Sequence, residues 1–145
     1  MSKSNSWETA MLQLLFENTN AANIGDATGL RASTTAGSLY FSLHTSDPGE
    51  AGDQTTNEVA YTSYARVAVA RSAAGWTVTG NAVAVDANVV FPAGTGGSGT
   101  ATHWGLGTAA SGAGVLLYKG TISPSIVCGS GVTPTLTAGT VVTED

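Results

Sequence analysis

The chain has 145 residues, of which only 10% are charged, and its formal net charge is −5. Its scattered Lys and Arg residues form no basic patch, which excludes nucleic-acid binding through phosphates, and no apolar stretch reaches the roughly 18 residues of a membrane span. Cys128 is the single cysteine, which excludes an internal disulfide and a cysteine-based metal site, so we expect the chain to be made in a reducing cytoplasm.

The first periodic segment is 6–18, which predicts an amphipathic helix. Ser6 suits the N-cap position, and Glu8 suits the positive end of the helix dipole. Leu12 and Phe16 lie outside the main apolar stripe, so the helix is apolar on more than one side. The stripe consists of Trp7, Ala10, Met11, Leu14 and Leu15.

Two roles are open for this helix. It can cover one open face or end of the sheet structure that follows, or it can dock into a groove of a neighbouring subunit. The anchors for such partner docking are Trp7, Met11, Leu14 and Leu15. The helix and an irregular connector together make up residues 1–37.

From residue 38 onward the apolar period changes to two, which is typical of strands. The alternation is clearest at Leu39, Phe41 and Leu43, and turn signals recur at roughly the 8–12 residue spacing of sandwiches and barrels. No helical segment separates the strands, which excludes a parallel sheet with crossover helices. We predict an all-β fold, an antiparallel, jelly-roll-like β-sandwich of about eight strands over residues 38–145, preceded by one helix within a single globular domain.

An acidic loop follows the first strand. Asp47, Glu50 and Asp53 recur every third residue, whereas a calcium loop places its ligands at every second position, so a connecting turn is favoured over a metal site. Arg66 and Arg71 follow nearby, and pairing with Glu58 or Asp53 would pin the loop to the sheet. The expected interface loop therefore comprises Asp47, Glu50, Asp53 and Arg66.

Other candidate sites are weak. His44 and His103 are expected at a surface or interface, because no nucleophile-elbow pattern accompanies them and two histidines without a third ligand make a poor zinc site. The glycine-rich segment 94–99 lacks the lysine of a phosphate-binding loop. We expect no catalytic residue, no cofactor and no metal, and hence no enzyme.

Several segments resemble a family of small virion structural proteins of tailed bacteriophages, which are often labelled tail-fibre proteins. The most specific is "LYFSLHTSDPGEAG" (39–52) followed by "NEVAYTSYARVAVA" (57–70). The later "VVFPAGTGGSGTATHWGLGTAASGAGVLLYKGTI" (89–122) and "PTLTAGTVVTED" (134–145) are similar to it as well. The resemblance implies a component of the virion without catalytic residues or cofactor.

Three functions follow as hypotheses. The first is a capsid decoration or cement protein, assembled as a homotrimer on the major capsid protein, because the chain is small, charge-poor and without fibrous repeats. The alternative is a tail-fibre or tail-tip component that binds a receptor through its loops. A glycan-acting enzyme ranks last, because the acidic loop holds the only carboxylate cluster.

Overall fold

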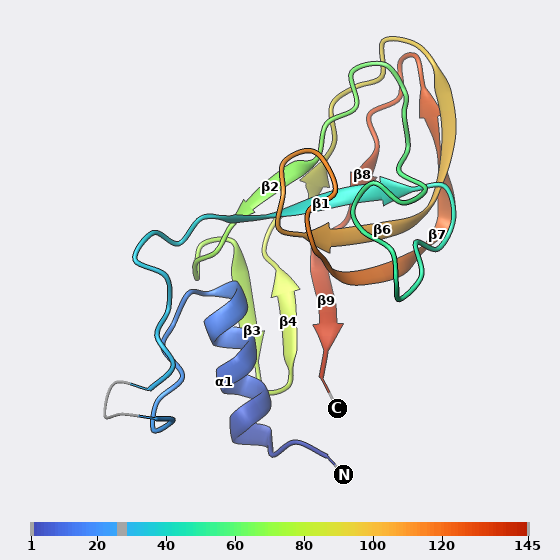
Figure 1. Ribbon diagram of the computed structural model, residues 1–145. Helices are drawn as coiled ribbons and strands as arrows, with labels where there is room; N and C mark the ends of the chain where they lie inside the picture. Colours follow the sequence, from blue (N-terminus) through green and yellow to red (C-terminus); the bar gives the residue numbers. More distant parts are fainter. Residues whose placement is uncertain (1, 26–28, 145) are drawn as a thin grey trace. The chain divides into compact units, whose positions relative to one another are not determined.

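The computed structural model describes residues 2–25 and 29–144, which form one helix, α1 (Asn5–Phe16), and nine strands (Figure 1). The strands are β1 (Ser38–His44), β2 (Val67–Ala70), β3 (Trp76–Thr79), β4 (Ala82–Val85), β5 (Val89–Val90), β6 (Ser98–Gly107), β7 (Leu116–Gly129), β8 (Thr135–Leu136) and β9 (Gly139–Thr143). They form sheets in the orders β2-β1-β6-β7, β3-β4-β9 and β5-β8. The predicted fold class, antiparallel and mostly β with one N-terminal helix, is confirmed.

The chain divides into two compact units. The first contains α1 and the sheet of β3, β4 and β9. The second contains β5, β6, β7, β8 and nearly all of β1 and β2. The division into 1–37 and 38–145 within one globular domain stays a prediction.

In the first unit, α1 packs against β3 and β4 through Leu12 and Phe16, which are 1% and 0% exposed. The Phe16 ring meets the edge of the Trp76 ring at a centroid distance of 4.8 Å. These residues lie outside the stripe that the sequence emphasises, so the minor apolar side of the helix forms its intramolecular contact. The helix also begins earlier than predicted, since Ser4, and not Ser6, occupies the N-cap position.

Arg71 joins the end of α1 to the connector. Its guanidinium donates to the carbonyl oxygens of Leu14 (2.8 Å), Leu15 (2.6 Å) and Ala36 (2.9 Å). The last carbonyls of a helix have no partner within the helix and carry its negative dipole end, so a cation is favoured there. The predicted pairing of Arg71 with the acidic loop is therefore wrong.

In the second unit, β1 is buried on both faces. Leu39, Phe41 and Leu43 form the apolar face, but Ser42 and His44 on the other face are also 0% exposed. The expectation of a surface or interface position for His44 is wrong, because other segments of the unit cover that face. The paired strand β6 adapts to it by placing a glycine, Gly105, opposite Ser42.

Strand β7 is one continuous strand from Leu116 to Gly129. The apolar segments 115–122 and 125–128 on their own predict two strands with a break at Ser123 and Pro124. Its register against β6 shifts where Thr121 pairs with His103 and Ile126 pairs with Ala101, so an irregular stretch around Pro124 replaces the expected break. Strand β6 in turn begins at Ser98, inside the glycine-rich segment 94–99.

The contact between Phe16 and Trp76 leads to a prediction about the stability of the first unit. Phe16→Ala removes a fully buried ring, and we expect it to lower the free energy of unfolding by about 3–5 kcal/mol in urea titrations. Met11→Ala, on the exposed side of the same helix, serves as the control and should cost about 1 kcal/mol or less. Equal losses would contradict this assignment of the buried face.

Candidate functional site

The acidic loop between β1 and β2 is organised by local turns. The Asp47 Oδ1 atom accepts a hydrogen bond from the Gly49 amide (2.8 Å), and the Asp53 Oδ1 atom accepts from the amide (2.8 Å) and hydroxyl (2.6 Å) of Thr55. These bonds stabilise the carboxylates and lower the pKa of both aspartates. The two residues therefore act as turn formers, as the sequence favoured.

Gln54, which the sequence did not single out, anchors the loop. Its side chain is 0% exposed, and its Oε1 atom accepts from the Ala109 amide at 2.9 Å. The backbone amide of Gln54 donates to the carbonyl oxygen of Ala113 at 2.9 Å. The space for it depends on Gly107, where a Cβ would lie 2.3 Å from the Gln54 side chain. A lone glutamine in a polar loop carries no sequence signal of burial.

Lys119 on β7 forms ion pairs with the same loop. Its Nζ atom lies 3.0 Å from Asp47 Oδ1 and 3.5 Å from Glu50 Oε1. The hydrogen bond to Asp47 raises the pKa of Lys119. Because the Glu50 side chain is 97% exposed, the pair with Glu50 is screened by solvent and contributes little.

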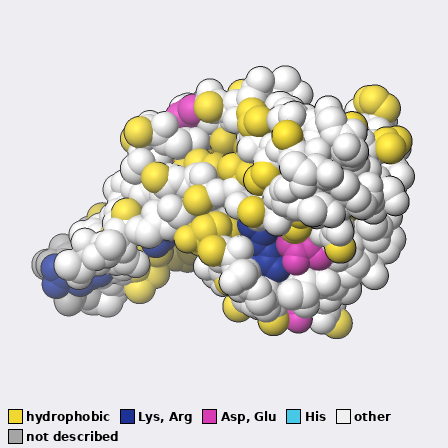
Figure 2. All heavy atoms as spheres, turned by 90° about the horizontal axis from the view of Figure 1, so that it is seen from above, with side chains coloured by type: hydrophobic (Ala, Val, Ile, Leu, Met, Phe, Trp, Pro, Cys, Tyr) yellow, Lys and Arg dark blue, Asp and Glu magenta, His cyan; other side chains and the backbone are white. Residues whose placement is uncertain are grey.

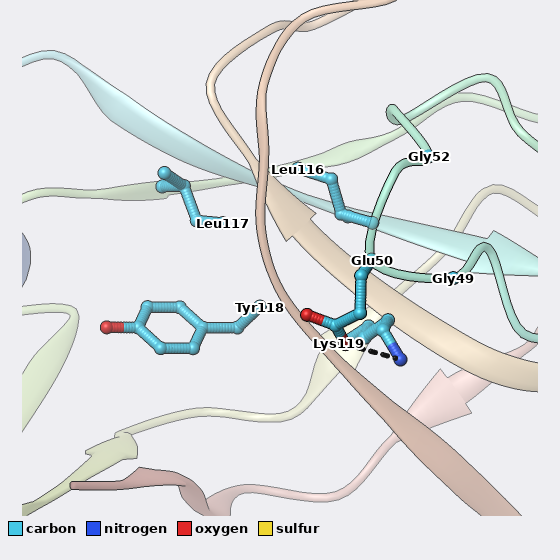
Figure 3. Close-up of a pocket in the computed structure, with 7 residues that line it drawn as sticks. All are labelled: Gly49, Glu50, Gly52, Leu116, Leu117, Tyr118 and Lys119. Carbon is cyan, nitrogen blue, oxygen red and sulfur yellow. Dashed lines mark ion pairs between the residues drawn. The ribbon is translucent and has the colours of Figure 1, made fainter.

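These residues border an open groove of about 300 Å³. It is lined by Gly49, Glu50, Gly52, Leu116, Leu117, Tyr118 and Lys119. In Figure 3 the Glu50 and Lys119 side chains meet, whereas the Tyr118 ring and the Leu117 side chain point away from them. The groove therefore presents an ion pair whose opposite charges largely cancel, which leaves little net charge to hold a charged ligand.

Glu58 and Arg66 form the buried ion pair of the second unit. The Arg66 Nε and Nη2 atoms donate to the two Glu58 oxygens at 2.7 and 2.8 Å, and Nη1 donates to the Ala109 carbonyl at 2.9 Å. The Tyr64 hydroxyl also donates to Glu58 (2.8 Å) and accepts from the Leu43 amide (3.0 Å). Burial raises the pKa of Tyr64 well above its ordinary value.

The pairing predicted for Arg66 is thus correct for Glu58 and wrong for Asp53, which binds Thr55 instead. The Arg66 side chain is only 3% exposed, so its contacts lie inside its own unit. Of the expected interface loop, Asp47 and Glu50 remain exposed and lie together at Lys119. A role of these residues in an interface stays a prediction.

Ser42 and His44 form a hydrogen-bonded pair that resembles a catalytic dyad. The Ser42 Oγ atom lies 2.8 Å from His44 Nε2, and His44 Nδ1 lies 2.8 Å from the Thr56 carbonyl oxygen. Because a carbonyl can only accept, Nδ1 carries the proton and Nε2 accepts from the serine. Both side chains are 0% exposed, so no substrate reaches them, and the pair fastens the end of the acidic loop to β1.

The predicted docking residues lie on α1 in the first unit. Met11 is 40% exposed, and Trp7, Leu14 and Leu15 are partly exposed. The acidic loop belongs to the second unit, so the two sets of candidate residues are positioned by different parts of the fold.

The described ranges hold no group of three or more His, Cys, Asp or Glu side chains placed to bind a metal ion. With 12 residues, α1 is shorter than the roughly 20 residues of a membrane-crossing helix, and the same ranges hold no helix of that kind.

Comparison with known families identifies the chain. Residues 2–144 match the family described as "Podophage GP4 fiber I protein gp80". The chain belongs to this family. It is therefore a structural protein of a bacteriophage particle, and the resemblance noted from its sequence is confirmed. No curated protein matches the chain in sequence.

The buried ion pair of this fibre-family protein gives a stability prediction. Arg66→Met leaves Glu58 without its charge partner, and we expect a loss of about 3 kcal/mol in the free energy of unfolding, the lower end for a buried pair because Glu58 keeps 17% exposure. Lys119→Met is the matched control at the exposed pair and should leave the urea midpoint almost unchanged. Similar midpoints for both variants would refute the distinction.

The His44 pair gives a pH prediction. Burial lowers the pKa of His44, so the unfolded chain, with a pKa near 6.5, takes up its proton first. Stability is full above pH 6.5 and falls as the pH drops towards the folded pKa, with a slope of at most about 1.4 kcal/mol per pH unit. Urea titrations between pH 7.5 and 5.5 measure it.

His44→Gln should remove most of this pH dependence, whatever its effect on stability at pH 7.5. His103→Gln, on the paired strand, is the control and should keep it. A wild-type protein whose stability is constant over this range would contradict the assignment.

Proposed function

We propose that this chain is a structural subunit of a podophage fibre, with no enzymatic activity, which assembles with copies of itself and with other virion proteins. The observation that carries the proposal is the family match over residues 2–144, whose description names a fibre protein. The match covers both compact units, so it applies to the molecule as a whole and not to one module.

The distribution of polar groups supports a mechanical role. Most charged side chains of the second unit interact with other groups of the same unit, as in the pair of Glu58 with Arg66 and the pair of Asp47 with Lys119. On the face seen in Figure 2, most side chains are uncharged. A surface with few charges loses little hydration energy when neighbouring subunits cover it.

A second candidate is the capsid decoration protein predicted from the sequence, in which homotrimers bind the major capsid protein. One observation favours it: the sequence has no internal repeat, whereas extended shafts are commonly built from repeated units. The two functions differ in where the protein lies on the particle and in how many copies a particle carries.

Antibody labelling of intact virions distinguishes the two. We expect an antibody raised against the chain to label the tail region in negative-stain micrographs, and quantitative electrophoresis to give far fewer copies than the major capsid protein. A matched phage with a stop codon in this gene is the control and should lose the label while keeping filled heads. Label spread over the head, with copies comparable to those of the capsid subunit, would favour decoration and reject the fibre.

A further inference from the structure

The acidic loop, residues 45–58, covers the polar face of β1 without an apolar core of its own. It contains no branched aliphatic, methionine or aromatic residue, and only Pro48 and Gln54 in it are buried. Hydrogen bonds fasten it instead: the Gln54 side chain binds the backbone that follows β6, and the Thr45 amide donates to the Asn57 carbonyl oxygen at 2.8 Å. Segments with few buried apolar contacts open at a lower free energy than the core around them. The loop can therefore separate from β1 while the sheet stays folded.

His44 is the side chain that the closed loop keeps from water. Its ring is 0% exposed, with Nδ1 donating to the Thr56 carbonyl oxygen of the loop and Nε2 accepting from the Ser42 hydroxyl. On β6, a Cβ added to Gly105 would lie 2.6 Å from Nε2, so the strand backbone lies directly against the ring. The ring is thus enclosed by β1, β6 and the loop, and of these only the loop can move without breaking the sheet.

The charged and titratable groups around His44 do not compensate a positive ring. They are Glu58 in the loop, Tyr64 and Arg66 after it, His103 on β6, and Lys119 of β7, which lies opposite Gly105. Glu58 attracts a proton to His44, but both of its oxygens already bind Arg66. Arg66 and His103 act in the opposite direction. Burial outweighs these charges and lowers the pKa of His44 while the loop is closed.

We propose that the acidic loop is an acid-sensitive lid, which opens when His44 takes up a proton and leaves the sheet of β1, β6 and β7 folded. Protonation turns Nε2 into a donor, so the Ser42 hydroxyl loses its acceptor, and the new charge meets a carboxylate already paired with Arg66. Opening of the loop lets water solvate the ring. The open form therefore binds the proton more tightly than the closed form, and a falling pH shifts molecules from closed to open.

The size of the shift follows from proton linkage. In the open form the His44 ring has its ordinary pKa near 6.5, so the ratio of open to closed molecules rises by at most about tenfold between pH 7.5 and 5.5. Opening also parts Asp47 and Glu50 from Lys119, because the two carboxylates move with the loop and the lysine stays on β7. The surface around the groove then changes with pH.

Amide hydrogen exchange of the full-length chain, followed by NMR, measures the opening. The Thr45 and Gln54 amides report it, because their acceptors on Asn57 and Ala113 are separated from them when the loop opens. We expect both amides to be less protected than those of β6 at pH 7.5. Their protection, corrected for the intrinsic exchange rate, should fall by up to about tenfold by pH 5.5.

Three variants separate the proton from the other bonds of the loop. His44→Gln does not titrate in this range, so the loss of protection with falling pH should disappear. Gln54→Ala removes a side-chain anchor that carries no titrating proton, so it should lower protection at every pH and leave the pH dependence as in the wild type. His103→Gln is the matched histidine control and should behave like the wild type.

Two results on the wild type alone would overturn the inference. The first is a loop whose amides are as protected as those of β6, which would mean that they exchange only by global unfolding. The second is loop protection that is constant from pH 7.5 to 5.5. An unchanged pH dependence in His44→Gln would likewise reject His44 as the sensor. The inference does not rest on the fibre proposal, because exchange is measured on the isolated chain and position in the particle is measured by labelling.

Discussion

The burial of β1 on both faces is the constraint on which the second unit depends. A strand covered on one side only can leave its polar residues in water, but Ser42 and His44 have no access to solvent and must find partners inside. Thr56 supplies one, because the acidic loop turns back against β1. The same turn brings Glu58 beside the end of β1, where Arg66 and Tyr64 satisfy its carboxylate. The acidic loop and β1 are therefore joined by one network of polar side chains.

In the first unit, α1 carries more apolar side chains than its contact with β3 and β4 buries. Leu12 and Phe16 pack on β3 and β4, and Arg71 holds the last turn through its carbonyl oxygens. Glu17, just beyond the helix, accepts a hydrogen bond from the Val78 amide of β3. The helix is thus fixed by apolar packing at its middle and by hydrogen bonds at its end, and its second apolar side remains partly exposed.

The sequence was sufficient to locate most helices and strands, but it did not show which of their faces are buried. Alternation located β1, and the same alternation of Val with small or polar residues recurs in β3 and β4, which are joined at Gly80 with its positive φ of 61°. Periodicity also located α1, but a helix with two apolar sides does not reveal which side faces its own sheet. The burial of His44 was missed because alternation marks only the apolar face, and a covered polar face looks the same as a solvated one.

The candidate site was predicted in part for the same reason. Spacing identified Asp47 and Asp53 as turn residues, and proximity in sequence suggested the pair of Arg66 with Glu58. The partners of Gln54 and Lys119 lie far away in the sequence, so no local sequence pattern predicts the contacts of these two residues. Strand β7, which carries Lys119, is an outer strand paired only with β6 in its sheet order. Open strand edges invite further strands to add, and proline interrupts the row of donors that such addition needs. Pro124 removes one backbone donor from this outer strand, and the shifted register around it interrupts the regular row of groups that an added strand would need.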